Sequence, residues 1–337
     1  MPKLQPGVVA EWLKNQTDAI ETNILKIKPL YGGASMETWL ISADFNGGSF
    51  DGIIDLILRT DPDAALPQSI GALREFQVLQ IVNSENIITP KPLFVDSEGI
   101  LCGKPAFFMT SISGNPAVQT DNILFKDPKS IPTSFTKTIG RQLARIHNID
   151  PAKTLINLLH SRGQQPRIEY FWEQLDQIPF SLPTIEWAIR WLNMNLSETN
   201  APTLCHGDFR SSNIMRDNQT LTGIIDWEFA HYGNPLEDLG WFCARCWRYG
   251  NDTKRAGGVG ELKDLMAGYE EEAHNTIDWS LLPYWEVNAT VHWSIIAHQQ
   301  GLRYCNDSKK SLELVLTGEK AAEIEYDLLE QIRNFKG

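Results

Sequence analysis

The sequence has no hydrophobic stretch long enough to cross a membrane. A helical span needs about 20 apolar residues in succession, and no run in the 337 residues approaches that length. The first residues, MPKLQPGVVAEWLKNQ, also have no apolar core of secretory length. The five cysteines are odd in number and irregularly spaced, which predicts no disulfide framework. These absences favour a cytoplasmic protein that has no membrane partner.

Basic residues are also in short supply. The chain has 30 Lys and Arg against 42 Asp and Glu, a formal net charge of -12. Because binding to a phosphate backbone needs clustered Lys and Arg, we predict no nucleic-acid partner. A neutral or cationic small molecule fits the charge better, although an acidic surface also serves solubility alone. The composition does not specify an oligomeric state.

The first third of the chain has the pattern of a β-sheet. Apolar runs at 24–31, 36–45 and 51–60 are separated by glycine-rich turns, which are typical of antiparallel strands. Residues 68–82 then repeat apolar side chains at helical spacing, and two further strands are predicted at 91–97 and 104–112. We therefore expect a small antiparallel β lobe with one helix.

The remainder of the chain has the pattern of helices. Apolar residues recur at helical spacing in 134–149, 168–175, 184–196 and several stretches after Pro235. A chain of this length is usually too long to fold around a single hydrophobic core. We predict an α+β fold of two lobes, with residues 1–112 forming the N-terminal lobe with a hinge and 113–337 the C-terminal lobe.

One segment of the second lobe, LCHGDFRSSNIMRDNQTLTGIIDWEF, interrupts the helical pattern with polar loops. Asp208 is followed five positions later by Asn213, and the apolar run GIID ends at Asp226. Phosphoryl transfer needs one carboxylate to orient and deprotonate a hydroxyl, and a carboxylate and an amide to hold Mg²⁺. Each of these residues alone is commonly a turn or cap residue. Their joint spacing favours a phosphotransferase.

The same segment resembles the aminoglycoside phosphotransferase family, the small-molecule branch of the protein-kinase-like fold. Protein kinases carry H-R-D-x-x-x-x-N and D-F-G, and the corresponding strings here are HGDFRSSN and DWE. The resemblance implies a two-lobed, protein-kinase-like fold and transfer of the γ-phosphoryl group of ATP or GTP to a hydroxyl of a small molecule. A protein kinase is disfavoured because no H-R-D, D-F-G and A-P-E set is present.

The resemblance also implies roles for individual residues. Asp208 would be the catalytic base, and Asn213 and Asp226 would ligate Mg²⁺. Arg210 stands where many protein kinases carry a lysine near the γ-phosphate, so we expect its guanidinium to stabilise the transferring charge. Asp238, in EFAHYGNPLEDLGWF, would buttress the catalytic loop.

A nucleotide site is implied in the first lobe. The string GGASMETWLI resembles the phosphate-covering loop of the family, which assigns Gly32, Gly33 and Ser35 to the phosphates. Arg59, in LILR, stands where kinases carry the third-strand lysine of V-A-I-K. The string PAFFMTSISG resembles the hinge along the nucleotide base, with contacts from Met109, Thr110, Ser111 and Ile112.

Glu75 is predicted to pair with Arg59 from its position on the first-lobe helix. It lies at the edge of the apolar stripe, with no basic residue three or four positions away. An unpaired, partly buried carboxylate is costly, and Arg59 is the natural partner. The alternative is a glutamate that reaches solvent at the edge of the stripe.

The acceptor is the least specified feature of the sequence. The acidic run Glu270-Glu271-Glu272 would suit an aminoglycoside, but such runs are mostly solvated helix faces. The string SLELVLTGEKAAEIEYDLLEQI resembles a branch that includes kinase domains attached to acyl-CoA dehydrogenases, which favours a metabolite alcohol. The alternatives are a choline- or homoserine-type kinase and a non-catalytic, nucleotide-binding protein.

Overall fold

The computed structural model describes residues 4–30, 36–62, 68–118, 131–150, 159, 164–196, 202–306 and 312–335. The chain forms two compact units, each with its own hydrophobic core. Unit 1 consists of Met1–Gly114 and Met215–Ala230, and unit 2 of Asn115–Ile214 and His231–Gly337. The segment Met215–Ala230, which carries Asp226, thus belongs to unit 1. The lobe boundary after residue 112 stays a prediction.

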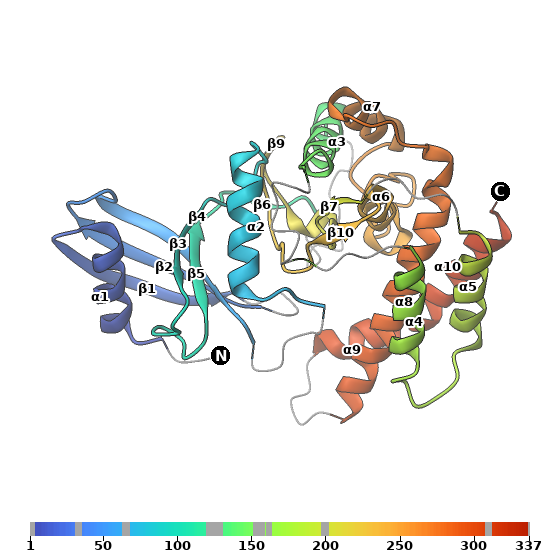
Figure 1. Cartoon of the computed structure of the whole chain (residues 1–337), viewed down its shortest axis with the longest axis horizontal. Helices are drawn as coiled ribbons and strands as arrows, with labels where there is room; N and C mark the ends of the chain where they lie inside the picture. Colours follow the sequence, from blue (N-terminus) through green and yellow to red (C-terminus); the bar gives the residue numbers. More distant parts are fainter. Residues whose placement is uncertain are drawn as a thin grey trace. The chain divides into compact units, whose positions relative to one another are not determined.

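Unit 1 is built on a five-stranded sheet in the order β1-β2-β3-β5-β4 (Figure 1). All neighbouring strands are antiparallel, as predicted. Alternate residues of β2 are buried, from Trp39 to Phe45, because successive side chains of a strand point to opposite faces. The strands are β1 (Glu21–Leu30), β2 (Glu37–Asn46), β3 (Gly52–Thr60), β4 (Pro92–Asp96) and β5 (Ala106–Thr110).

The described part of unit 1 contains two helices. The predicted helix is α2 (Ala72–Ser84), which packs against β4 and β5. A second helix, α1 (Pro6–Thr17), was not predicted; it begins with a proline in its first turn, and its buried Val9, Trp12 and Leu13 join the sheet core. The segment Met215–Ala230 of unit 1 carries β9 (Thr220–Ile224), which follows β8 (Ile214–Asp217). At the end of β9, Ile224 N donates to Ile88 O at 2.8 Å.

Unit 2 is mainly helical, as predicted. Its strands are short: β6 (Asn115–Pro116), β7 (Thr203–Cys205) and β10 (His231–Gly233), of which the last two pair antiparallel. The α-helices are α3 (Thr133–His147), α4 (Gln164–Leu175), α5 (Pro183–Met194), α6 (Pro235–Cys243), α7 (Leu262–Glu272), α8 (Leu282–Asn306), α9 (Leu312–Glu319) and α10 (Ala321–Arg333). Among the described residues, three 3₁₀ turns lie between them: η3 (Ser211–Asn213), η4 (Arg245–Trp247) and η5 (Trp279–Leu281).

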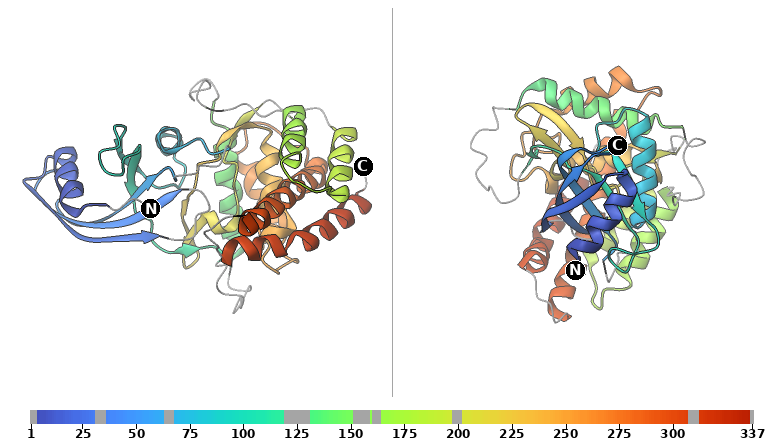
Figure 2. Two further views of the ribbon diagram at one scale, coloured as in Figure 1. Left: turned by 90° about the horizontal axis from the view of Figure 1, so that it is seen from below. Right: turned by 90° about the vertical axis from the view of Figure 1, so that its left-hand side faces the viewer.

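Two glycines allow α3 and α7 to lie side by side, as both Figures 1 and 2 show. A Cβ atom at Gly140 would collide with the Leu265 carbonyl, and one at Gly268 would collide with the Lys137 carbonyl. This close approach brings His147 at the end of α3 next to Tyr269 of α7, with 2.8 Å between Nδ1 and the hydroxyl oxygen. Among the described residues, no helix is both long and apolar enough to span a membrane.

Candidate active site

The carboxylate of Asp208 is held by three side-chain donors of unit 2. Its Oδ1 accepts from Trp241 Nε1 at 2.9 Å. Its Oδ2 accepts from Arg210 Nε at 2.9 Å and from Asn213 Nδ2 at 2.8 Å. Asp208 is 7% exposed, so this orientation is fixed in a mostly dry environment.

Asn213 is placed by the 3₁₀ turn η3, in which its N–H donates to Arg210 O at 2.8 Å. Its amide nitrogen donates to two acceptors, Asp208 Oδ2 and Asp208 O, the latter at 2.9 Å. Because both neighbours are acceptors, the orientation of the amide is determined. The Asn213 Oδ1 atom is therefore the side-chain atom that could ligate a cation, and a hard oxygen ligand suits Mg²⁺.

The loop that carries Asp208 is braced by Asp238, as the resemblance implied. Asp238 accepts from the N–H groups of His206 at 2.7 Å and Gly207 at 2.9 Å. Gly207 has a φ of +84°, a backbone conformation that side chains oppose. Asp238 lies in the first turn of α6, whose capping box joins Asn234 and Glu237. The helix thus fixes the loop that carries Asp208.

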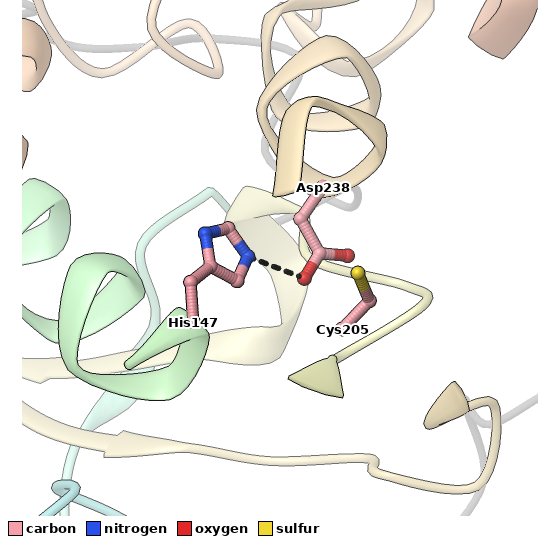
Figure 3. Close-up of side chains that lie close together, drawn as sticks. All are labelled: His147, Cys205 and Asp238. Carbon is pink, nitrogen blue, oxygen red and sulfur yellow. Dashed lines mark hydrogen bonds and ion pairs between the residues drawn. The ribbon is translucent and has the colours of Figure 1, made fainter. Parts of the chain in front are cut away.

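Asp238 is also part of a buried cluster with His147 and Cys205 (Figure 3). The potential ligand atoms of the three residues lie within 4.8 Å of one another. Burial raises the pKa of the Cys205 thiol well above its usual range, so the thiol keeps its proton. Burial alone would also raise the pKa of Asp238, but hydrogen bonds from His147 and the Gly207 N–H lower it. We interpret the cluster as a brace, because the Asp238 oxygens already accept from the loop.

Arg210 connects Asp208 to aromatic residues that the sequence analysis did not assign. Besides its bond to Asp208, its guanidinium carbon lies 4.9 Å from the centroid of the Trp247 ring. Trp241, whose indole N–H binds Asp208, packs against Trp247 with ring centroids 5.2 Å apart. Trp241 lies three residues after Asp238, so helical spacing to the buttressing aspartate is the signal that could have identified it.

In unit 1, Arg59 lies between two carboxylates. Its Nε donates to Glu75 Oε2 at 3.1 Å, and its Nη2 donates to Asp226 Oδ1 at 2.7 Å. The contact between Arg59 and Glu75 is the pairing that the sequence predicted. Glu75 Oε1 also accepts from Trp227 N at 3.3 Å, which ties α2 to the segment after β9. Asp226 has a φ of +72°, a strained conformation that is common at functional sites.

Burial and charge have opposite effects in this cluster. Burial raises the pKa of Glu75 to about 7, although Arg59 lowers it. Burial alone would lower the pKa of Arg59, but Glu75 and Asp226 raise it, so the guanidinium stays charged. A permanent cation beside two carboxylates, one of which titrates near neutral pH, is a suitable environment for phosphate and metal ligands.

The remaining predicted nucleotide contacts are placed in part. Met109 and Thr110 end β5, and the Thr110 N–H donates to Lys91 O at 2.9 Å, which leaves Ser111 and Ile112 beyond the strand. The predicted phosphate-loop residues Gly32, Gly33 and Ser35 lie outside the described residues. Their roles, like those of all the predicted site residues, stay predictions.

The predicted residues thus form two groups. Asp208, Arg210 and Asn213 lie together in unit 2. Arg59, Glu75 and Asp226 lie together in unit 1. Within each group the side chains meet at hydrogen-bonding distance.

Comparison with known proteins decides the family. Residues 26–278 match the model of the phosphotransferase enzyme family, APH. The chain belongs to this family. Among solved structures, a Ralstonia eutropha protein assigned to the aminoglycoside phosphotransferases is similar, with a TM-score of 0.75 and 17% identity over 99% of this chain and 100% of that chain. Spectinomycin phosphotransferase APH(9)-Ia, in complex with ADP and spectinomycin, has a TM-score of 0.65 and 15% identity over 97% and 99%.

The chain is also similar to part of a larger curated relative. Acyl-CoA dehydrogenase family member 10 of Mus musculus is 27% identical over 201 residues, which are 56% of this chain and 18% of the mouse protein. The chain covers less than a third of the length of this and the other acyl-CoA dehydrogenase relatives it matches. The solved neighbours support the predicted two-lobed, kinase-like α+β fold.

Proposed function

We propose that the chain transfers the γ-phosphoryl group of ATP or GTP to a hydroxyl of a small molecule, with Asp208 as the base. The observation that carries this proposal is the carboxylate of Asp208, which three donors hold in one orientation. A carboxylate that is only solvated needs no fixed orientation, whereas a general base must be directed at the proton that it accepts. A non-catalytic, nucleotide-binding role leaves this arrangement without a purpose.

In the proposed reaction, the acceptor hydroxyl donates its proton to Asp208 as its oxygen bonds to the γ-phosphorus. The bond to the bridging oxygen breaks, and the nucleoside diphosphate leaves with that electron pair. Arg210, bonded to the same carboxylate at 2.9 Å, would stabilise the charge on the transferring group. Arg59 would bind the α- and β-phosphates, with Glu75 holding it in place.

Asn213 and Asp226 are the proposed ligands of a divalent cation. Asn213 offers an amide oxygen and Asp226 a carboxylate, both hard ligands of the kind Mg²⁺ prefers. When bound, Mg²⁺ would neutralise charge on the phosphate oxygens. Gly32, Gly33 and Ser35 would cover the phosphates, and residues Met109, Thr110, Ser111 and Ile112 would border the base of the nucleotide.

Charge pairing in unit 2 favours a metabolite alcohol over an aminoglycoside. Two of the three carboxylates in the acidic run that would have bound a polycation are paired: Glu271 with Arg141 at 2.6 Å and Glu272 with Arg145 at 2.9 Å. A polyamine sugar would have to displace these arginines. The five cysteines are free, which fits a reducing, cytoplasmic compartment.

A screen for transfer tests the proposal. Wild-type protein is incubated with MgCl₂ and γ-³²P-labelled ATP or GTP, together with alcohols, choline, homoserine and kanamycin, and phosphorylated products are detected by mass and label. We expect label on at least one hydroxyl compound, and none with Asp208→Asn. Equal labelling by the variant would refute the assignment of the base.

A further inference from the structure

Tyr269, His147 and Asp238 form a chain of buried hydrogen bonds that takes no direct part in the proposed reaction. The Tyr269 hydroxyl oxygen lies 2.8 Å from His147 Nδ1, and His147 Nε2 lies 3.3 Å from Asp238 Oδ2. The exposed fraction is 3% for Tyr269, 5% for His147 and 1% for Asp238. Because buried polar groups are almost always paired, each of these hydrogen bonds should have one defined donor.

The tautomer of His147 follows from its two partners. The oxygens of the Asp238 carboxylate accept, so the hydrogen on this side belongs to His147 Nε2. The Tyr269 hydroxyl has no hydrogen-bond partner other than His147 Nδ1 in the described part of the chain, so it donates its hydrogen to Nδ1. Burial raises the pKa of Tyr269, so the hydroxyl keeps this hydrogen. Nδ1 is therefore an acceptor and Nε2 a donor.

The Asp238 carboxylate also holds the backbone that leads to Asp208. Its Oδ2 accepts from His206 N at 2.7 Å, and its Oδ1 accepts from Gly207 N at 2.9 Å. Asp208 N in turn donates to His206 Nδ1 at 3.2 Å. A rotation of the Asp238 carboxylate would therefore displace the two residues that precede Asp208.

The Nε2–H group of His147 restrains this carboxylate from α3, as the dashed line in Figure 3 shows. With the hydrogen on Nδ1 instead, two acceptor atoms, His147 Nε2 and Asp238 Oδ2, would face each other at 3.3 Å. The resulting repulsion would turn the carboxylate away. Tyr269 opposes this tautomer, because its hydroxyl can donate only to a nitrogen that carries no hydrogen.

We propose that His147 and Tyr269 are positioning residues for Asp208. The Tyr269 hydroxyl sets the tautomer of His147, and the His147 Nε2–H group holds Asp238 against the loop. Neither residue contacts a substrate in this scheme, since both act through Asp238. This inference rests on the proposed function, because Asp208 is the base whose position these contacts determine.

Tyr269→Phe tests the role of the hydroxyl. The values of kcat and KM for MgATP are measured with the best acceptor of the screen, which includes choline, homoserine and kanamycin. We expect kcat to fall about three- to tenfold, as for one lost hydrogen bond. KM for MgATP is expected to stay unchanged, because Arg59, the proposed phosphate ligand, belongs to unit 1.

Tyr284→Phe is the matched control. Tyr284 is 2% exposed, and its hydroxyl donates to Leu192 O at 3.3 Å, outside the chain of hydrogen bonds that leads to Asp238. The variant thus loses a buried phenol hydroxyl of the same kind, and we expect it to leave kcat unchanged. An equal fall in kcat for Tyr284→Phe and Tyr269→Phe would overturn the inference.

Substitution of His147 tests the donor. His147→Gln keeps a side-chain N–H for Asp238, whereas His147→Leu has none. We expect His147→Leu to lower kcat about tenfold or more, as for a lost hydrogen bond to a charged group, and His147→Gln to restore part of this loss. Equal kcat values for the two variants would overturn the assignment of Nε2–H as the donor.

The tautomer is measured separately, by ¹⁵N spectra of protein labelled at histidine. The His147 signals are identified among the seven histidines by their absence in His147→Gln. We expect the wild type to carry hydrogen on Nε2 and none on Nδ1, and the Nδ1 signal to shift in Tyr269→Phe. Thermal unfolding identifies any variant that fails to fold, and the wild-type spectrum still tests the tautomer.

The outcomes separate this inference from the proposed function. If wild-type His147 carries its hydrogen on Nδ1, or if Tyr269→Phe transfers phosphate with the wild-type kcat, the inference is overturned and the proposed function stands. If the wild type transfers label to no hydroxyl compound, the proposed function and the positioning role are both overturned, whatever the tautomer.

Discussion

The two units each contain a buried arginine, and the two arginines have different surroundings. Arg59 in unit 1 contacts two carboxylates, Glu75 and Asp226. Arg167 in unit 2 contacts one carboxylate, Glu237, at 2.6 Å, and its guanidinium also contacts Asn288 and His292. Both residues are 7% exposed. The comparison separates a cluster with an excess of negative charge from one whose charges balance.

The Arg167 cluster is satisfied within unit 2. Arg167 Nε donates to Asn288 Oδ1 at 2.9 Å, and its Nη2 lies 3.3 Å from His292 Nδ1. Glu237 Oε2 also lies 3.1 Å from His231 Nε2, while Oε1 accepts from Asn234 N at 3.1 Å. Such a cluster joins α4, α6 and α8 and needs no ligand. The Arg59 cluster, by contrast, can accept a further cation, which fits a metal-nucleotide site.

Replacing Arg167, whose charge is balanced by Glu237, is expected to have the largest effect on stability. Arg167→Met leaves Glu237 buried without its cation, which should lower the free energy of unfolding by about 3–5 kcal/mol. Urea unfolding measures this change. Arg190→Met, at an exposed arginine of α5, is the control and should change little. A loss below about 1 kcal/mol for Arg167→Met would remove the distinction between the two clusters.

The burial of Glu75 in the Arg59 cluster predicts a pH dependence of stability. Burial raises the pKa of Glu75 to about 7 from 4.5, so between these values the folded chain binds a proton that the unfolded chain releases. The stability from this proton is fully present below pH 4.5 and is lost as pH rises through about 7. The full span corresponds to about 3 kcal/mol.

Urea unfolding from pH 5 to pH 8, in EDTA and without nucleotide, tests this dependence. We expect the free energy of unfolding of the wild type to decrease relative to that of Glu75→Gln, which has no such proton. Parallel profiles for the two proteins would show that Glu75 does not titrate in this range.

Substitution of Asp226 should weaken nucleotide binding only when Mg²⁺ is present. We expect Asp226→Asn to weaken nucleotide affinity about tenfold or more with Mg²⁺ present, because a carboxylate ligand is lost, and to change it little in EDTA. Calorimetric titration under both conditions measures this. Asp217→Asn, at an exposed aspartate of β8, is the control. An equal loss with and without Mg²⁺ would contradict a role in holding the metal.

The exposed ion pairs of α7 should have the smallest effect. The Glu271 side chain is 43% exposed, so its pairing with Arg141 is worth only about 0–1 kcal/mol. Glu271→Ala is expected to change the free energy of unfolding by no more than that and to leave acceptor preference unchanged. A change in acceptor preference would indicate that the acidic run Glu270-Glu271-Glu272 is part of the acceptor site.

Local patterns explain which parts of the molecule were predictable. The strands of unit 1 were predicted because alternating burial leaves a period of two in the sequence, as in β2. The pairing of Glu75 with Arg59 was predicted because Glu75 has no basic partner on its own helix. Helix α1 was missed, although Pro6 and the spacing of Val9, Trp12 and Leu13 are helical signals.

Contacts between distant residues were the least predictable. Arg59 and Asp226 are 167 positions apart, and their ion pair depends on the return of Met215–Ala230 to unit 1. Trp241 is 33 positions from Asp208, and an indole N–H has no charge pattern that would reveal its acceptor. The sequence thus predicts the residue types of the candidate site, but not the aromatic partner that orients Asp208.

The most direct measurement compares Asp208→Asn with the wild type in both phosphoryl transfer and nucleotide binding. The account predicts that kcat falls about 10²- to 10⁴-fold, because a general base is lost, while calorimetric affinity for MgATP is essentially unchanged. A variant that transfers phosphate at the wild-type rate would contradict the central claim.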